Sequence, residues 1–127
     1  MVKRDWFIFT LFTVLVVGVI LEQVYTDNTY AKMETDISSL QTNIKSSKLE
    51  ESRKLADSID DFWNNREVVL SLFVDYRDIE QIGRQLELIK AHLGNEDFEL
   101  AKVECNLLEH IVKTFHNTIG FNWQNII

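Results

Sequence analysis

The residues that could do chemistry in this sequence are one cysteine and three histidines, all in its last third. Cys105, Glu109 and His116 lie near one line of the helix expected there. Thiolate, carboxylate and imidazole are the groups that bind zinc or act as nucleophile and base. A metal or redox sensor built on Cys105 and His116 is therefore one hypothesis for the function.

The spacing of these residues favours packing over chemistry. His110 and His116 are six positions apart, which places them on different faces of a helix, whereas a helical metal pair needs a spacing of four. Cys105 falls in an apolar row between Ala101 and Leu108, where a small thiol is ordinary core. Neither a Glu-x-x-His pair, a glycine-rich phosphate loop nor a Gly-x-Ser-x-Gly elbow occurs. We expect a protein that is not an enzyme, with no catalytic, cofactor-binding or metal-ligating residue and no cofactor.

Composition excludes two further classes. The 127 residues carry a formal net charge of -7, so the chain lacks the basic surface that nucleic acid requires. The single cysteine excludes an intramolecular disulfide. The charge is concentrated from Thr26 onward, where 18 acidic and 11 basic residues account for all of it. We therefore expect an acidic, water-facing domain after residue 25.

The first part of the chain is apolar enough to cross a membrane. No charge occurs from Trp6 to Leu21, and sixteen helical residues span about 24 Å of a hydrocarbon core of roughly 30 Å. With Trp6 and Tyr25 as interfacial anchors, residues 6–25 are predicted to form a transmembrane helix in the lipid bilayer. A cleaved signal peptide and a buried soluble helix are the alternatives, and the scarcity of small residues just after Leu21 argues against cleavage.

The flanking charges predict the orientation of this span. Lys3 and Arg4 precede it, and the next basic residue is Lys32. By the positive-inside rule, residues 1–5 are cytoplasmic and the domain after the span is extracytoplasmic. The predicted location is a single-pass protein of the cell membrane.

Residues 26–46 are expected to continue this helix as a juxtamembrane stalk. Five apolar residues repeat there at alternating spacings of three and four, which places them on one stripe of a helix. The stripe has two interpretations: it packs on the chain's own bundle, or it forms a parallel coiled-coil homodimer of the kind found in division proteins. Its members are Tyr30, Met33, Ile37, Leu40 and Ile44.

A second helix is predicted to begin near Ser47. Ser47 and Glu50 have the spacing of a capping box, in which each side chain satisfies a backbone donor at a helix start. Arg66 interrupts the apolar face of this helix, and we expect its charge to lie at the edge of the seam or to pair with a carboxylate. The face contains Leu55, Ile59, Phe62, Val69, Phe73 and Tyr76, and it is widened by Trp63, Leu70 and Val74.

Two further helices follow, joined by a short antiparallel connection. The third is expected to begin at Asp75 or Asp78 and to end at Gly94, with Gly94 in the left-handed position. Asn95 is expected to cap the fourth helix. The core row of that helix has a second apolar row beside it, which predicts a central helix with two neighbours. The second row contains Leu100, Val103, Leu107 and Ile111.

Gly120 is expected to stop the fourth helix and to leave an apolar tail. The predicted fold class is therefore all-α: a transmembrane helix, a stalk helix, and an antiparallel three-helix bundle over residues 47–127 that ends in this tail. The tail is the candidate partner-binding segment, and its large apolar residues are Phe121, Trp123, Ile126 and Ile127.

Several short segments carry a resemblance to a known family. They are the runs Phe73-Val74-Asp75-Tyr76, Ile79-Glu80-Gln81-Ile82 and Leu107-Leu108-Glu109-His110-Ile111, with Asn125-Ile126-Ile127 at the end. With the N-terminal anchor, they resemble small, uncharacterised, single-pass membrane proteins of Firmicutes that carry a helical domain of unknown function. The resemblance implies a membrane protein partner, because members are often encoded beside a YetF-like multispanning protein. It supplies no catalytic residues.

The leading hypothesis is a non-enzymatic, membrane-anchored interaction module that binds another membrane or envelope protein. The binding site would be the groove beside the third and fourth helices, or the tail around Trp123. A structural coiled-coil protein of the division type is the alternative, with the sensor based on Cys105 and His116 as a third.

Overall fold

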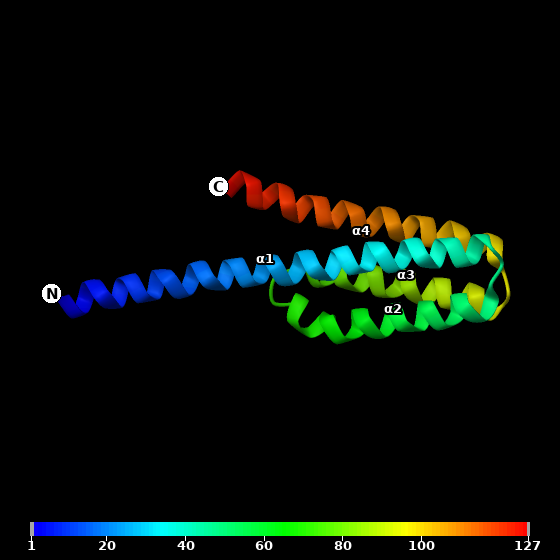
Figure 1. Cartoon of the computed structure of the whole chain (residues 1–127), viewed down its shortest axis with the longest axis horizontal. Helices are drawn as coiled ribbons and strands as arrows, with labels where there is room; N and C mark the ends of the chain where they lie inside the picture. The colour runs from blue at the N-terminus through cyan, green and yellow to red at the C-terminus, as the bar shows by residue number, and fades with distance from the viewer. Residues whose placement is uncertain (1, 127) are drawn as a thin grey trace.

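The chain folds entirely into helices in the part that the structure describes. This computed structural model describes the backbone of residues 2–126 and the side chains of residues 3–117. The described backbone contains no strand, which confirms the all-α class. The helices are α1 (Val2–Lys45), α2 (Leu49–Leu70), α3 (Tyr76–Gly94) and α4 (Phe98–Ile126) (Figure 1).

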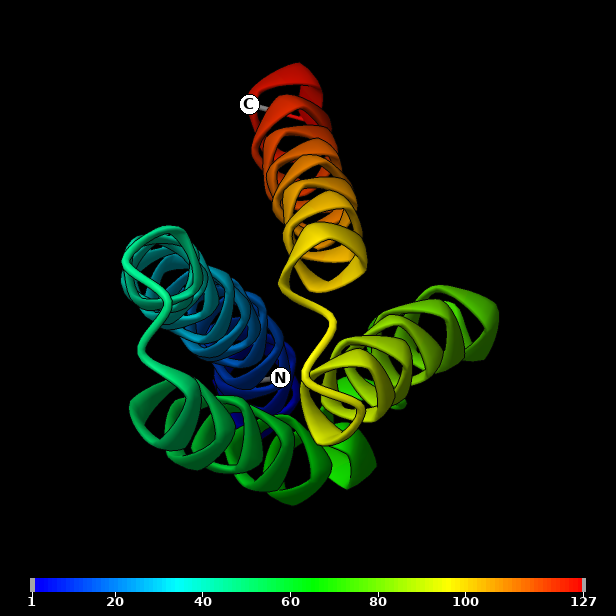
Figure 2. The same ribbon diagram turned by 90° about the vertical axis from the view of Figure 1, so that its right-hand side faces the viewer.

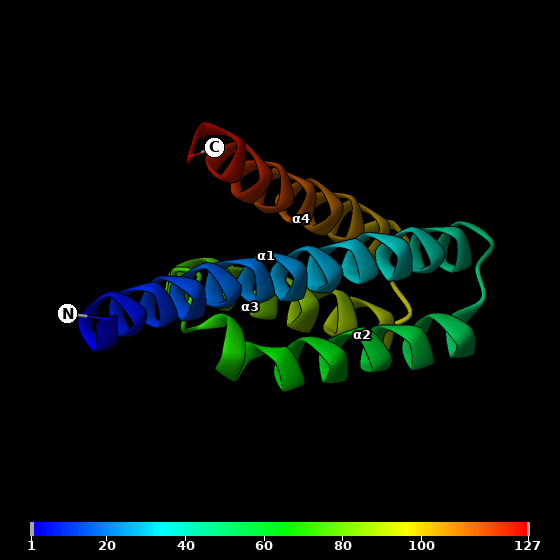
Figure 3. The same cartoon turned by 60° about the vertical axis from the view of Figure 1, so that its left-hand side comes forward.

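The four helices run alternately in opposite directions. α1 packs on α2 and α4, and α3 packs on the same two helices. The end-on view in Figure 2 shows the helices arranged around a common interior. α4 diverges from the other helices toward its C-terminal end, as the turned view in Figure 3 shows. The architecture is an up-down-up-down bundle with short connections.

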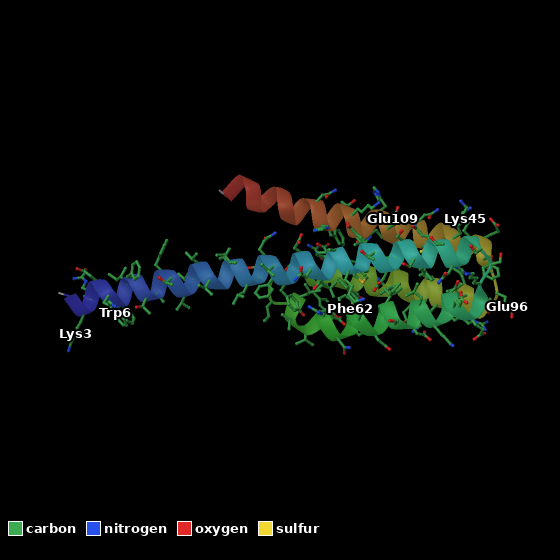
Figure 4. The ribbon with its side chains drawn as sticks, viewed as in Figure 1. Lys3, Trp6, Lys45, Phe62, Glu96 and Glu109 are labelled. Carbon is green, nitrogen blue, oxygen red and sulfur yellow. The ribbon has the colours of Figure 1, made fainter. Side chains whose placement is uncertain are left out.

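α1 is one uninterrupted helix of 44 residues, about 66 Å long. Its N-terminal half extends beyond the bundle, and Lys3 and Trp6 lie there (Figure 4). This half contains a segment that is long and apolar enough to cross a membrane, and none of that segment is buried by the rest of the chain. The protein therefore has one apolar helical extension that is continuous with a packed bundle.

Residues 26–46 belong to the bundle and do not form a separate stalk. Tyr30, Met33, Ile37 and Leu40 are fully buried, and Ile44 is 3% exposed. The second half of α1 is thus one of the four helices of the bundle. The sequence had predicted a bundle of only three helices, over residues 47–127. The physical reason is the stripe itself, because its apolar area is removed from water only when α2 and α4 cover it. The same burial makes the predicted coiled-coil homodimer seam inaccessible to a second copy.

A single aromatic side chain links three of the helices in the core. Trp63 of α2 is fully buried, and its ring centroid lies 6.1 Å from that of Tyr30 on α1. Its indole Nε1 donates a hydrogen bond of 3.3 Å to the carbonyl oxygen of Ile79 on α3. Trp63 thus fills the centre of the bundle with its polar atom satisfied.

The connection between α1 and α2 differs from the predicted capping box. Ser47 adopts a left-handed conformation with φ of 57°. Its N–H donates to the oxygen of Ile44, and the N–H of Lys48 donates to the oxygen of Asn43. This is a Schellman motif, which ends α1. α2 then begins at Leu49 without a side-chain cap. Ser47 therefore ends α1 in a left-handed conformation and does not cap α2.

Between α3 and α4, the left-handed residue and the N-cap each lie two positions after the residues that the sequence predicted. Gly94 is the last residue of α3 and has no positive φ, whereas Glu96 has φ of 59°. The cap of α4 is Asp97, whose Oδ1 accepts the N–H of Leu100 at 3.0 Å, so Asn95 is not the cap. The N–H of Glu96 donates to the oxygen of Leu93 and the N–H of Asp97 to the oxygen of His92, so the left-handed position falls on Glu96.

The start of α3 is as predicted. Asp75 is the N-cap, and its Oδ1 accepts the N–H of Arg77 at 2.9 Å. Hydrogen bonds from the side chain and backbone of Arg77 hold the pKa of the Asp75 carboxyl below its usual value. An acidic cap at this position also complements the positive end of the helix dipole.

α4 ends later in the chain than the sequence predicted. The helix continues through Gly120 to Ile126, so no folded-back tail follows it. A glycine inside a helix costs about 1 kcal/mol relative to alanine and does not by itself end the helix. α4 therefore runs back toward the apolar half of α1 (Figure 1).

Candidate functional site

The structure separates the two residues of the sensor hypothesis. Cys105 is fully buried, with its Sγ 4.0 Å from the carbonyl oxygen of Ile37 on α1. His116 lies eleven residues further along α4, about 16 Å away along the axis. No group of three side chains suited to a metal ion occurs among residues 3–117. Burial and the nearby charge of Glu109 raise the pKa of the Cys105 thiol to about 12, so the reactive thiolate is scarce at neutral pH.

His116 instead joins α4 to α1 through two carboxylates. Its Nε2 lies 2.6 Å from Oδ1 of Asp27, and its Nδ1 lies 3.3 Å from Oε1 of Glu34. Burial alone would lower the pKa of His116, but the hydrogen bonds to these two carboxylates outweigh burial and raise it. The ring also stacks on Tyr30, with centroids 6.0 Å apart. The imidazole of His116 is thus held between two acidic side chains of α1.

The guanidinium of Arg66 on α2 lies over two aromatic rings. Its guanidinium carbon lies 4.8 Å from the ring centroid of Tyr25 and 4.9 Å from that of Phe62. Among the described side chains it forms no ion pair. The edge position expected from the sequence is therefore observed, without the carboxylate. Stacking over aromatic faces stabilises the cation while its N–H donors remain available.

The two predicted interfacial anchors lie in different surroundings. Trp6 is 70% exposed on the part of α1 that extends beyond the bundle (Figure 4). Tyr25 is partly buried against the core and lies under Arg66. The ring of Tyr25 therefore marks the level at which the apolar extension meets the bundle.

The second apolar row of α4 is largely exposed. Leu100 and Leu107 are each 46% exposed and Val103 is 59% exposed, whereas Ile111 is buried. We name the three exposed residues and Leu88 of α3, also 46% exposed, the α4 stripe. α4 has the two neighbours that were expected, α1 and α3. Of its second apolar row, only Ile111 is buried.

The residues of the α4 stripe belong to α3 and α4, two helices that pack on each other. The amide nitrogen of Gln85 on α3 donates to the carbonyl oxygen of Glu104 on α4 at 2.9 Å. This hydrogen bond joins the two helices. The sequence signal for the stripe was present in the spacing of the second row, but the spacing could not show which side it faced.

The predicted tail residues occupy the last turns of α4. The backbone of Phe121, Trp123 and Ile126 is helical. Their side chains, and the whole of Ile127, lie outside the described part of the structure. The backbone places this segment at the end of the bundle from which the apolar half of α1 extends (Figure 1).

These features define a class of protein: an all-α chain in which one apolar helix leads directly into a four-helix bundle. The chain belongs to the family described as domain of unknown function DUF4363, whose model matches residues 20–126. The match includes residues 26–46, in agreement with their place in the bundle. No curated protein and no solved structure matches the chain.

Proposed function

We propose that this protein is a non-enzymatic interaction module anchored in the cell membrane by residues 6–25. Its short N-terminus is cytoplasmic, and its bundle lies outside the cytoplasm and binds another membrane or envelope protein. The exposed apolar half of α1 supports the anchor. The charge pattern around the span supports the orientation.

The α4 stripe is the observation that carries the binding proposal. Leu100, Val103 and Leu107 follow one another at helical spacing on α4 and are close to half exposed or more, as is Leu88 on the neighbouring helix α3. Contiguous apolar surface of this kind marks interaction sites in soluble domains. An amphipathic helix of a partner would cover the stripe by the helix-in-groove mode.

The partner class that we favour is a multispanning membrane protein. The resemblance to single-pass proteins encoded beside YetF-like proteins supports this choice. The geometry is also suitable, because α1 continues without a break from the anchor into the bundle. The helix therefore holds the stripe at a constant height above the membrane.

Site-specific photo-crosslinking tests the binding surface. A photoreactive residue at Val103 should crosslink the full-length protein to a co-expressed YetF-like protein. The same residue at Lys102, which is exposed on another face of α4, is the matched control and should give little product. Equal yields from both positions would refute the stripe as the interface.

Two polar substitutions give a second test of the same surface. Val103→Glu and Leu107→Glu should reduce capture of the partner at least tenfold, since each would place a charge in an apolar contact. Because both side chains are exposed, helix content and unfolding midpoint should change little. Deletion of Phe121–Ile127 should separately weaken capture if the last turns of α4 contribute to the interface.

Cysteine labelling tests the orientation. Cys105 is buried, so the native chain gives a low background. A cysteine at Glu96, at the end of the bundle opposite the apolar extension (Figure 4), should react with a membrane-impermeant maleimide in intact cells. A cysteine at Lys3 should react only after lysis. The reverse result would place the bundle in the cytoplasm.

A further inference from the structure

A groove of about 790 Å³ lies between α1 and the C-terminal end of α2. It follows α1 from Val14 to Asn28, a length of about 21 Å. The groove is located where the apolar half of α1 meets the bundle, beside Phe62 and Arg66. Its volume is within the usual range for sites that bind small molecules.

The groove is apolar at one end and polar at the other. Toward the N-terminus of α1 its walls are aliphatic, and α2 and the turn after it add further apolar side chains. Arg66, Glu22 and Asn28 line the end near the bundle. The apolar walls include Val14, Gly18, Leu21, Val24, Val69 and Phe73. The polarity therefore changes along α1 in the same direction as the polarity of a membrane leaflet.

Gly18 makes the apolar end of the groove open. A Cβ atom at this position would meet no atom within 4 Å outside its own helix turn. The missing side chain leaves a notch between the neighbouring aliphatic residues. An extended hydrocarbon chain fits such a notch, because it needs space between apolar side chains and no hydrogen-bonding partner.

Arg66 supplies the charge at the other end. Its guanidinium lies over the rings of Tyr25 and Phe62, and no carboxylate of the described residues forms an ion pair with it. A stacked guanidinium presents its N–H donors in the plane of the group, where they fit two oxygens of a phosphate. An apolar partner helix at this position would bury the charge without a counter-ion, which is costly.

The turn between α2 and α3 extends the apolar surface beside the groove. Val68 and Leu72 are about three-quarters exposed, and Phe73 and Tyr76 are about half exposed. These residues lie at the end of the bundle from which the apolar half of α1 extends. The groove is thus continuous with a surface suited to the bilayer interface.

We propose that this groove binds a phospholipid, with its phosphate on Arg66 and one acyl chain along Val14 to Leu21. The inference rests on the proposed membrane anchoring. It goes beyond it in assigning a lipid site where the bundle meets the bilayer. Glu22 adds a carboxylate to the polar end, so a headgroup that carries an ammonium beside its phosphate, as phosphatidylethanolamine does, meets complementary charges there.

Photo-crosslinking in reconstituted vesicles tests the site. The full-length protein is placed in phosphatidylcholine vesicles with a trace of phosphatidylethanolamine that carries a photoreactive acyl chain. Crosslinks should map to the groove side of α1 and to the end of α2. Uniform labelling around α1, or crosslinks to a second protein chain through this groove, would refute the proposal.

Two pairs of variants make the test specific. Arg66→Gln should reduce the phospholipid retained after extraction about tenfold, as loss of a charged hydrogen bond predicts, whereas Arg84→Gln, exposed on α3, should not. Gly18→Phe should fill the notch and give the same loss, whereas Val17→Phe, outside the groove, should not. Since Gly18 lies outside the bundle core, its variant remains informative if Arg66→Gln affects folding.

The same preparation distinguishes the two proposals. If alkaline carbonate extracts the protein from the vesicles, the membrane anchoring has failed. If the protein stays in the vesicles and the two members of each pair retain equal amounts of lipid, only the lipid site has failed.

Discussion

Nε2 of His116 on α4 lies 2.6 Å from Oδ1 of Asp27 on α1, although 89 positions separate the two residues. Glu34 contacts the other ring nitrogen from about two helical turns further along α1. The imidazole therefore bridges the point where α1 enters the bundle and the point where α4 begins to diverge from it. This contact joins α4 directly to α1.

The first prediction concerns the pH dependence of stability. The pKa of His116 is raised in the folded state, so its contribution is complete below the unfolded pKa of about 6.5 and is lost as pH rises through the folded pKa. The free energy of unfolding should fall by about 1 kcal/mol as the pH rises from the unfolded pKa to above the folded pKa of His116. This is the usual scale for a partly exposed ion pair. Urea unfolding of the full chain in detergent micelles, followed by circular dichroism, measures it.

His116→Gln should flatten this pH profile. His110→Gln provides the control, because His110 is exposed on the same helix. An unchanged profile in the His116 variant would show that the bridge carries no proton-linked stability.

A second prediction contrasts two tryptophans. Trp63→Ala should lower the free energy of unfolding by about 3–5 kcal/mol, since a fully buried aromatic side chain is lost and a cavity remains. Trp6→Ala should leave unfolding of the bundle unchanged, because Trp6 is exposed outside it. Near-ultraviolet circular dichroism and urea unfolding check both variants. Equal effects would contradict the position of Trp63 in the core.

The third prediction tests the connection between α3 and α4. Glu96→Gly should stabilise the protein by about 1 kcal/mol, because glycine adopts the left-handed conformation at no steric cost. Gly94→Ala should also be neutral or stabilising, since Gly94 is helical and an added Cβ meets open space. If Gly94 were the left-handed residue, as the sequence suggested, alanine there would destabilise the fold. Thermal unfolding of the two variants distinguishes the alternatives.

A fourth prediction concerns a carboxylate at the edge of the core. The side chain of Asp60 on α2 is 8% exposed, and its Oδ2 accepts a hydrogen bond of 2.9 Å from Nζ of Lys90 on α3. That hydrogen bond raises the pKa of Lys90. Lys90→Met should cost about 2 kcal/mol, because it leaves a buried charge without its partner.

The double variant Asp60→Ala/Lys90→Met should recover most of that loss, since the carboxylate is removed together with the cation. Urea unfolding of the two variants provides the comparison. If the double variant is clearly less stable than Lys90→Met alone, loss of the Asp60–Lys90 pair is not the cause of the destabilisation.

Much of the helical architecture could be predicted from local patterns. The apolar residues of α1, α3 and α4 repeat at helical spacing, and together with those of α2 they form the buried core. Asp75 was recognisable as a helix cap because its hydrogen bond joins residues two positions apart. The apolar half of α1 was recognisable because length and composition suffice. Each of these features depends on groups that are close together in the chain.

The helix ends were less certain for a physical reason. Ser47 suits an N-cap and Gly94 suits a left-handed position, but the left-handed conformations fall on Ser47 and Glu96. In both connections the left-handed residue and the residue after it donate backbone hydrogen bonds to the last turn of the preceding helix. The point at which the helix ends therefore decides which residue is left-handed, and a side-chain preference of about 1 kcal/mol does not.

The tertiary structure alone decided which surfaces meet. A stripe from Tyr30 to Ile44 is equally suited to a dimer and to the chain's own bundle, and only the packing of α2 and α4 chooses between them. The stripe of exposed residues on α4, the bridge from His116 to Asp27, and the rings around Arg66 all join residues from different helices or depend on which face is covered. The periodicity of a helix specifies that it has an apolar face, because that is a property of one segment. It does not specify the partner of that face, because the partner is set by the free energy of the whole chain.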